Sequence, residues 1–292
     1  MMNKLELQSL GKINLGLEVL GVRENGYHEV RMIMQTIYVC DDVTITRTSE
    51  PGIRLSSNLH FLPTDERNIA YKAAKMLLEE FKIEAGVSIR LVKRIPVSAG
   101  MAGGSSNAAT VLFGINRMFG LGLNETQLME RGVKLGADVP YCIMRGTALA
   151  EGIGEELHAL PPMPKCHILI AKPPFSVSTK WVYETLDDSK DIVHPNIDGV
   201  IEGLEEQNLE KIAANMGNML EEVTITKYPV IATIKEKMKE AGALGAMMSG
   251  SGPTVFGIFR ERIDAKKAYD VIRSEQLAKQ LYIAQVHNVK ER

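Results

Sequence analysis

The chain has 292 residues, of which 45% are hydrophobic and 24% are charged, as is ordinary for a globular protein of two domains or one large one. Its formal net charge of −2 leaves no basic surface for nucleic acid or an anionic membrane, and no apolar run approaches the ~20 residues that span a bilayer. Charges near the N-terminus argue against a signal peptide, and three widely spaced cysteines argue against a disulfide framework or a zinc cluster, so we expect a cytoplasmic protein.

The first part of the chain alternates apolar and polar residues, a pattern typical of half-buried strands. The alternation predicts strands over residues 4–8, 13–19, 30–37, 43–48 and 87–91. Asn25 and Gly26 are the strongest short signal for a hairpin turn. Lys12 follows Gly11 in an apolar neighbourhood, so its ammonium group must reach either solvent or an anion. A lysine that protects a sheet edge is the alternative interpretation.

Apolar residues at helical spacing predict helices over residues 68–81 and 108–118. Thr64 or Asp65 would cap the first of these helices. Asn124 and Gln127 resemble a capping box, which would open a third helix that we expect to end at Gly136.

The proline-rich segment 160–164 is the predicted linker. It divides the chain into an N-terminal domain of residues 1–160 and a C-terminal domain of residues 161–292. Strand and helix signals alternate after the linker, as in a small α/β sandwich. We expect strands over residues 167–171, 255–259 and 282–286, and helices over residues 179–186, 197–204, 209–220, 229–241 and 263–274.

A glycine-rich segment, Pro96 to Ala109, leads from a predicted strand directly into a predicted helix. Unpaired backbone N–H groups and the positive end of the helix dipole meet at a helix start, and glycines let the backbone approach an anion. The hydroxyls of Ser105 and Ser106 would cap the helix or bind Mg²⁺. The segment therefore indicates phosphate binding. It matches neither GxxxxGK[ST] nor GxGxxG, so a plain turn is the alternative.

Two further segments bear on this interpretation. Asp138 follows Gly136, and Pro140 disfavours helical backbone at Val139, so we predict a carboxylate on a short, restricted loop. An aspartate that merely forms a turn is the alternative. Residues 246–254 form a second loop of small residues in front of a predicted strand.

Three segments together resemble the signature motifs of the GHMP kinase superfamily: Lys12 to Leu15, Pro96 to Ala109, and Ser249 to Thr254. Within the superfamily, the chain is similar to the family of 4-diphosphocytidyl-2-C-methyl-D-erythritol kinases over residues 11–15, 25–30, 34–37, 136–142 and 146–154. The chain departs from that family's glycine-richer loop at Ser98, Met101 and Ala102, and has Gly11 where alanine is frequent, but no charged position differs.

The resemblance implies an α+β fold of two domains, with a ribosomal-protein-type βαβ domain first and a ferredoxin-like α/β sandwich second, and an active site in the cleft between them. It implies ATP-dependent phosphorylation, with Mg²⁺, of the 2-hydroxyl of 4-diphosphocytidyl-2-C-methyl-D-erythritol in non-mevalonate isoprenoid biosynthesis. The partner would be this small molecule. We expect a monomer or weak homodimer that binds neither nucleic acid nor a membrane.

The resemblance also implies roles for individual residues. Asp138 would accept the proton of the substrate hydroxyl, and Lys12 beside it would stabilise the transferred charge. Tyr27 and Tyr183 would stack on the cytosine ring and His28 would bond the base, with a core role for Tyr183 as the alternative. Substrate-binding roles fall on Asn14, Tyr27, His28 and Tyr183, a magnesium-binding role on Ser106, and ATP-binding roles on Pro96, Val97, Ser98, Ala99, Gly100, Met101, Ala102, Gly103, Gly104, Ser105, Ser106, Asn68 and Lys93.

Other functions stay open at this point. A superfamily kinase acting on mevalonate or homoserine would share the phosphate loop but not the cytosine-stacking pair. A catalytically silent relative would bind a nucleotide without turnover. An α/β scaffold with fortuitous glycine turns is the third alternative.

Overall fold

The computed structural model describes residues 2–24, 26–189 and 192–289. The chain divides into two compact units, each assembled from separate segments. The first unit comprises Met1–Gly11, Val39–Val97 and Ala102–Met144, and the second comprises Lys12–Tyr38, Ser98–Met101 and Arg145–Arg292. The predicted domain boundary at residue 160 remains a prediction. No helix in the described part of the chain is long and apolar enough to cross a bilayer.

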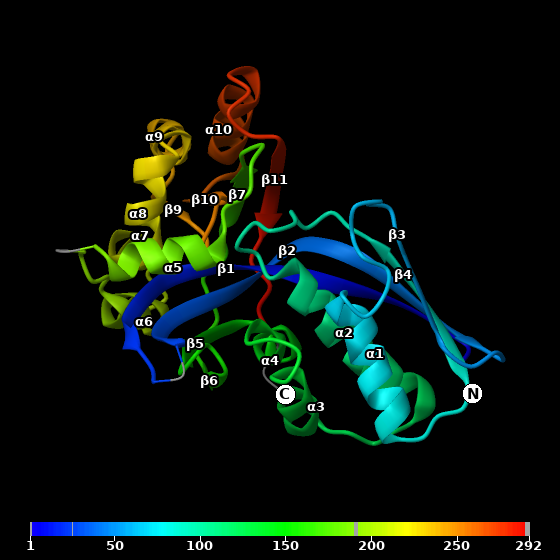
Figure 1. The fold of residues 1–292 in the computed structure, drawn as a ribbon. Helices are drawn as coiled ribbons and strands as arrows, with labels where there is room; N and C mark the ends of the chain where they lie inside the picture. Colours follow the sequence, from blue (N-terminus) through cyan, green and yellow to red (C-terminus); the bar gives the residue numbers. More distant parts are fainter. Residues whose placement is uncertain (1, 25, 190–191, 290–292) are drawn as a thin grey trace. The chain divides into compact units, whose positions relative to one another are not determined.

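Two long strands open the chain and contribute to both units (Figure 1). The two strands predicted around Gly11 form one strand, β1 (Lys4–Val22), and those predicted over 30–37 and 43–48 form one strand, β2 (His28–Thr48). Residues 9–17 are all buried. A strand that is covered on both faces does not need to alternate apolar and polar residues. The interruption of the alternation between residues 8 and 13 therefore reflects burial and not a turn. The hairpin turn predicted at Asn25 lies outside the described residues.

In the first unit, strands run in the order β3–β4–β2–β1. β4 (Gly86–Val92), predicted as 87–91, pairs antiparallel with β2 and parallel with β3 (Ile53–Ser57). The helices of this unit are α1 (Ile69–Glu80), α2 (Gly103–Phe119), α3 (Glu125–Gly132) and α4 (Asp138–Met144). α1 lies beside α2 (Figure 1). A Cβ at Gly114 would lie only 2.4 Å from Cδ1 of Ile45, so α2 packs closely on β2.

In the first unit, α1 and α3 begin where a side chain can accept a hydrogen bond from a free backbone N–H group of the helix. Asn68 caps α1 through a bond from the Ala70 N–H, so the predicted caps Thr64 and Asp65 were wrong. The capping box of Asn124 and Gln127 is confirmed. The helix that it opens ends at Gly132 and not at Gly136 as predicted.

The second unit contains two sets of paired strands. Within the unit, β5 (Thr147–Glu151) pairs antiparallel with β2, β6 (Glu156–Ala159) pairs antiparallel with β5, and β8 (Gly217–Asn218) pairs parallel with β1. The other set is an antiparallel sheet in the order β11–β7–β10–β9. Its strands are β7 (His167–Lys172), β9 (Gly245–Met248), β10 (Val255–Phe259) and β11 (Gln280–Gln285).

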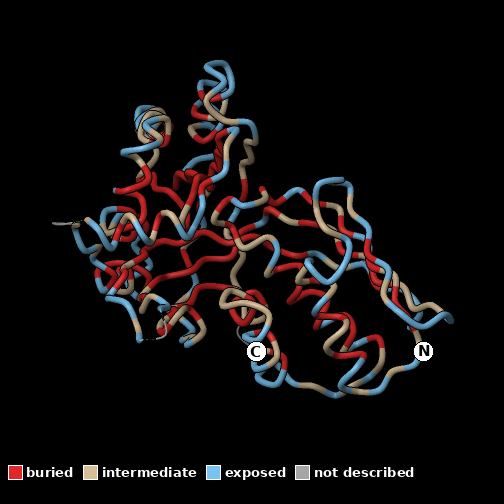
Figure 2. Tube along the Cα trace, in the orientation of Figure 1, coloured by how far each residue is buried: buried red, intermediate tan, exposed pale blue. Residues whose placement is uncertain are grey.

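The helices of the second unit are α5 (Thr179–Asp187), α6 (Ile197–Glu205), α7 (Leu209–Asn215), α8 (Met219–Lys227), α9 (Val230–Glu240) and α10 (Arg262–Ser274). α9 and α10 pack against the four-stranded sheet, whose β10 is buried at every residue (Figure 2). The helix predicted over 209–220 is two helices. Gly217 and Asn218 interrupt it as β8, and Asn218 caps α8.

Candidate active site

The glycine-rich segment forms a loop between β4 and α2, with its residues shared between the two units. Ser98, Gly100 and Ala102 all have left-handed backbone, with φ of 50°, 70° and 52°. Ala102 precedes α2 without a side-chain cap, and the first turn of α2 carries no acidic residue. The first backbone N–H groups of a helix have no partner inside the helix. At α2 these groups are therefore suited to bond an anion, and the phosphate-binding role of the segment remains a prediction.

A buried ion pair supports the start of α2 in the first unit. The ammonium group of Lys93 contacts the carboxylate of Asp41, and it also donates to Oδ1 of Asn107 at 2.7 Å and to the carbonyl oxygen of Gly103 at 3.2 Å. Asp41 in turn accepts from Nδ2 of Asn107 at 2.9 Å and from the backbone N–H of Ile95 at 2.8 Å. Burial lowers the pKa of Lys93, and the charge of Asp41 opposes that shift.

Two predicted ATP-binding residues, Lys93 and Asn68, already have hydrogen-bonding partners within the first unit. Lys93 is only 8% exposed, and its ammonium group is already engaged with Asp41. Asn68 caps α1 with its Oδ1 and donates from Nδ2 to the carbonyl oxygen of Pro63 at 2.9 Å. The ATP-binding roles of both residues remain predictions.

Lys12 lies beside the glycine-rich loop in the second unit. Its backbone N–H donates to the carbonyl oxygen of Met101 at 3.2 Å, and its ammonium group donates to Oδ1 of Asn14 at 2.7 Å. Lys12 is 5% exposed, so it is not a solvent-facing lysine that protects a sheet edge. No carboxylate forms an ion pair with it in the described part of the chain. A buried ammonium group without a counter-ion is costly, and a bound anion would relieve that cost.

The second loop of small residues contacts the glycine-rich loop directly, inside the second unit. The hydroxyl of Ser249 donates to the carbonyl oxygen of Gly100 at 2.9 Å. A Cβ at Gly100 would lie 1.9 Å from the carbonyl oxygen of Ser249, so only glycine fits there. Asn14, which is fully buried, is part of the same neighbourhood, because a Cβ at Gly250 would lie 3.5 Å from its Oδ1.

Two of the three residues predicted to bind the base, His28 and Tyr183, come together at the start of β2, also in the second unit. The rings of His28 and Tyr183 are in contact, with centroids 4.4 Å apart and planes inclined by 33°. Nε2 of His28 lies 2.9 Å from Oδ1 of Asp187. Tyr183 is half-buried, so it is not a core residue, and Tyr27 is 59% exposed.

Asp138 does not lie on a loop. It is the first residue of α4, and the prediction that Pro140 keeps Val139 out of a helix was wrong. Pro140 stands in the first turn, where its missing N–H would have had no partner inside the helix. Asp138 is half-buried, and in the described part of its own unit no side chain forms an ion pair with it. The carboxylate is thus available for chemistry.

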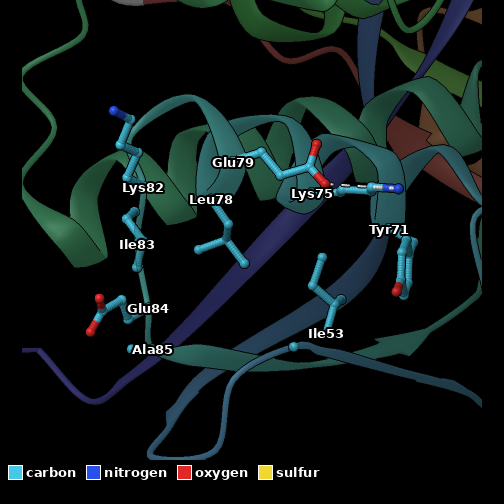
Figure 3. A pocket seen from close by; sticks show the side chains of 10 residues that line it. Ile53, Tyr71, Lys75, Leu78, Glu79, Lys82, Ile83, Glu84 and Ala85 are labelled. Atoms are coloured by element: carbon cyan, nitrogen blue, oxygen red, sulfur yellow. Dashed lines mark ion pairs between the residues drawn. The ribbon is translucent and has the colours of Figure 1, made fainter.

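Ser106 lies in the first turn of α2 and is 3% exposed. The described residues contain no cluster of three or more carboxylate, histidine or cysteine side chains that would hold a metal ion by themselves. A pocket of about 480 Å³ lies elsewhere in the first unit, between α1 and the segments that precede β3 and β4 (Figure 3). Leu78 points toward Ile53 there, and none of the predicted site residues lines it.

Sequence reasoning missed several polar residues that hold these loops. Asp41 stands inside a strand pattern, and Asn218 inside an apparent helix. The signal for Asp41 was a carboxylate in an apolar strand, which must be paired if it is buried. No comparable signal exists for Asn218, because helix spacing continues on both sides of it.

Two kinase families match the chain. A family described as "GHMP kinases N terminal domain" matches residues 68–146, and one described as "GHMP kinases C terminal" matches residues 200–279. The chain is 54% identical to a 4-diphosphocytidyl-2-C-methyl-D-erythritol kinase of Lachnospira eligens, with 96% of this chain and 98% of the relative covered. It is 51% identical to the kinase of the same name from Lachnoclostridium phytofermentans, with 99% of each chain covered.

A solved structure gives the same result. The crystal structure of a 4-(cytidine 5'-diphospho)-2C-methyl-D-erythritol kinase matches with a TM-score of 0.83 and 28% identity, over 98% of this chain and 100% of that chain. These matches confirm the predicted fold class. The chain therefore belongs to the 4-diphosphocytidyl-2-C-methyl-D-erythritol kinase family of the GHMP kinases.

Proposed function

We propose that this chain uses ATP to phosphorylate the 2-hydroxyl of 4-diphosphocytidyl-2-C-methyl-D-erythritol, giving the 2-phosphate and ADP in non-mevalonate isoprenoid biosynthesis. The observation that carries the proposal is Lys12: a buried ammonium group beside a glycine-rich loop, with no carboxylate paired to it in the described residues. That is the arrangement that a phosphate group would complete. Relatives at about half identity over nearly the full chain bear the name of this kinase.

The mechanism follows from what phosphoryl transfer requires, namely positioning and neutralisation of charge. The backbone of residues 98–106 would hold the phosphates of ATP, together with the start of α2. Asp138 would accept the proton of the substrate hydroxyl as its oxygen bonds to the γ-phosphorus. The bond from that phosphorus to the β–γ bridging oxygen breaks, and ADP leaves. Lys12 would stabilise the charge on the transferred group.

We also propose that Mg²⁺ accompanies ATP and that Ser106 contributes one ligand. Mg²⁺ is usually held by one or two protein groups together with substrate phosphates, so a site without a carboxylate cluster fits it. When bound, Mg²⁺ neutralises charge on the phosphates.

Changing Ser106 to alanine should therefore raise the Mg²⁺ concentration needed for half-maximal activity by about tenfold, because one ligand is lost. Activity titrated with MgCl₂ at fixed ATP measures this. With saturating Mg²⁺ the turnover of the variant should approach that of the wild type. An unaltered Mg²⁺ requirement would remove Ser106 from the metal site.

The base-recognition proposal rests on Tyr27, His28 and Tyr183. Changing Tyr27 to alanine should raise the KM for the cytidine substrate by about tenfold, since stacking of aromatic rings contributes ~0.5–1.5 kcal/mol. The KM for ATP should not change, and Tyr27→Phe should retain the wild-type value. Steady-state kinetics with each substrate varied in turn distinguish these results. Equal KM values for wild type and Tyr27→Ala would contradict the proposal.

The function itself is tested by measuring ATP consumption with three acceptors: 4-diphosphocytidyl-2-C-methyl-D-erythritol, mevalonate and homoserine. We expect turnover with the first alone. Turnover with either of the others, and none with the first, would make the chain a different GHMP kinase. ATP binding without turnover on any acceptor would identify a silent relative.

The remaining expectations rest on the sequence. Near-neutral charge supports the proposal that the chain binds neither nucleic acid nor a membrane, and a cytoplasmic location is proposed as well. A monomer or weak homodimer is likewise proposed, and sedimentation at micromolar concentration would test it.

A further inference from the structure

We infer that Asn218 is a positioning residue for the ATP site: it holds the loop Ser249–Gly252 against Gly100 and so fixes the backbone of the glycine-rich loop. The inference rests on the proposed function, in which residues 98–106 bind the phosphates of ATP. All the contacts that carry it lie within the second unit.

The side chain of Asn218 uses all of its bonding groups. Its Nδ2 donates to the carbonyl oxygens of Met248 and Gly250, at 2.8 and 2.9 Å. Its Oδ1 accepts from the backbone N–H of Leu220 at 3.0 Å, which caps α8. Asn218 is 7% exposed, so water cannot readily replace these partners. One amide group therefore ties the start of α8 to both sides of Ser249.

A second buried group on α8 holds the same loop. A carboxylate oxygen of Glu221, which is 8% exposed, accepts from the backbone N–H of Met248 at 2.5 Å. The other oxygen of Glu221 is paired with the ammonium group of Lys235 on α9. The backbone of Met248 is thus hydrogen-bonded at both its N–H and its carbonyl oxygen, so the residue that precedes the loop Ser249–Gly252 is held in place.

The loop transmits this position to the glycine-rich loop by direct contact. The Ser249 hydroxyl donates to Gly100, and a Cβ at Gly250 would lie 3.4 Å from Cα of Gly100. The next residue, Met101, accepts the backbone N–H of Lys12. A shift of Ser249 and Gly250 must therefore move Gly100, and with it the backbone that borders Lys12.

The test uses Asn218→Asp, which keeps the oxygen that caps α8 but turns a carboxylate toward two carbonyl oxygens. We expect the KM for ATP to rise about tenfold, because two hydrogen bonds are lost, while the KM for the phosphoryl acceptor is unchanged. Asn208→Asp is the matched control. Asn208 caps α7 with the same kind of bond, accepted from the backbone N–H of Lys211, and is exposed. If Asn218→Asp folds poorly, Asn218→Ser retains a cap and one donor and should show a smaller rise.

A double-mutant cycle with Ser249→Ala tests whether Asn218 acts through this loop. Residues in one network give non-additive effects, so the double variant should have a KM for ATP close to that of the worse single variant. If the fold-increase in the KM for ATP of the double variant equals the product of the two single fold-increases, the inference is overturned. The inference is also overturned if Asn218→Asp has the same KM for ATP as Asn208→Asp.

Amide hydrogen exchange separates failure of this inference from failure of the proposed function, because it needs no turnover. The N–H groups of Lys12, Ser249 and Gly252 donate to Met101, Thr254 and Ser249, respectively. They should exchange about tenfold faster in Asn218→Asp and Ser249→Ala than in Asn208→Asp, because loosening of the loop opens these bonds. Equal exchange in all variants would overturn the inference even if the wild type proves inactive. Inactivity alone would overturn only the proposed function.

Discussion

Replacing Asp138 with asparagine should lower kcat by about 10²–10⁴-fold and leave the KM for ATP close to the wild-type value. Asparagine has nearly the same shape but cannot accept the proton of the substrate hydroxyl, and general-base catalysis contributes about this factor. The carboxylate is half-buried and has no ion-pair partner in the described part of its unit, so no stabilising pair is lost with it. Steady-state kinetics with ATP varied at saturating acceptor give both parameters.

Asp138 is also the first residue of a helix, where a negative charge stabilises the helix dipole by about 0.3–1 kcal/mol. Glu125→Gln is the control for this second effect, because Glu125 opens α3 in the same unit. Both variants should lose similar stability on thermal unfolding, while only Asp138→Asn loses turnover. A kcat within tenfold of wild type for Asp138→Asn would show that another group takes the proton.

The parts of the fold that the sequence predicted are those governed by local chemistry. Asn124 with Gln127 opens α3 as predicted, because cap preferences act within a few residues. Predictions from local sequence patterns were wrong where segments distant in sequence pack against the element. The alternation in β1 is interrupted over residues 9–12, which are all buried. The predicted helix is interrupted at β8, where Asn218 bonds to Met248 and Gly250, some 30 residues away.

The candidate site divides in the same way. The glycine-rich loop and a helix after it could be predicted from residues that are neighbours in sequence, although α2 begins at Gly103 and not at residue 108. The bond between Ser249 and Gly100 joins residues 149 positions apart, and that between Lys93 and Asp41 joins residues 52 apart. Spacing rules cannot predict such contacts from a single sequence. The resemblance to a kinase family supplied the grouping of Lys12 with the loop, and the bond from Lys12 to Met101 supplies its physical basis.

The contact between the glycine-rich loop and Ser249 leaves no room for a side chain at Gly100. Gly100→Ala should therefore lower kcat/KM for ATP by about 10²-fold or more. The new Cβ would lie 1.9 Å from the carbonyl oxygen of Ser249, a contact that only movement of backbone can relieve. A displacement of about 1 Å at a reacting site is enough for a loss of this size. The left-handed φ of 70° adds strain of about 1–2 kcal/mol.

Gly120→Ala separates the strain from the clash. Gly120 has a similar φ of 63°, but a Cβ there would meet nothing within 4 Å. Its alanine variant should unfold at a lower temperature and keep the wild-type kcat/KM for ATP, because only the strain of left-handed backbone is introduced. If Gly100→Ala matches Gly120→Ala in kinetics as well as in stability, then Ser249 and Gly100 can separate without cost. The contact between the two loops would then have no part in holding ATP.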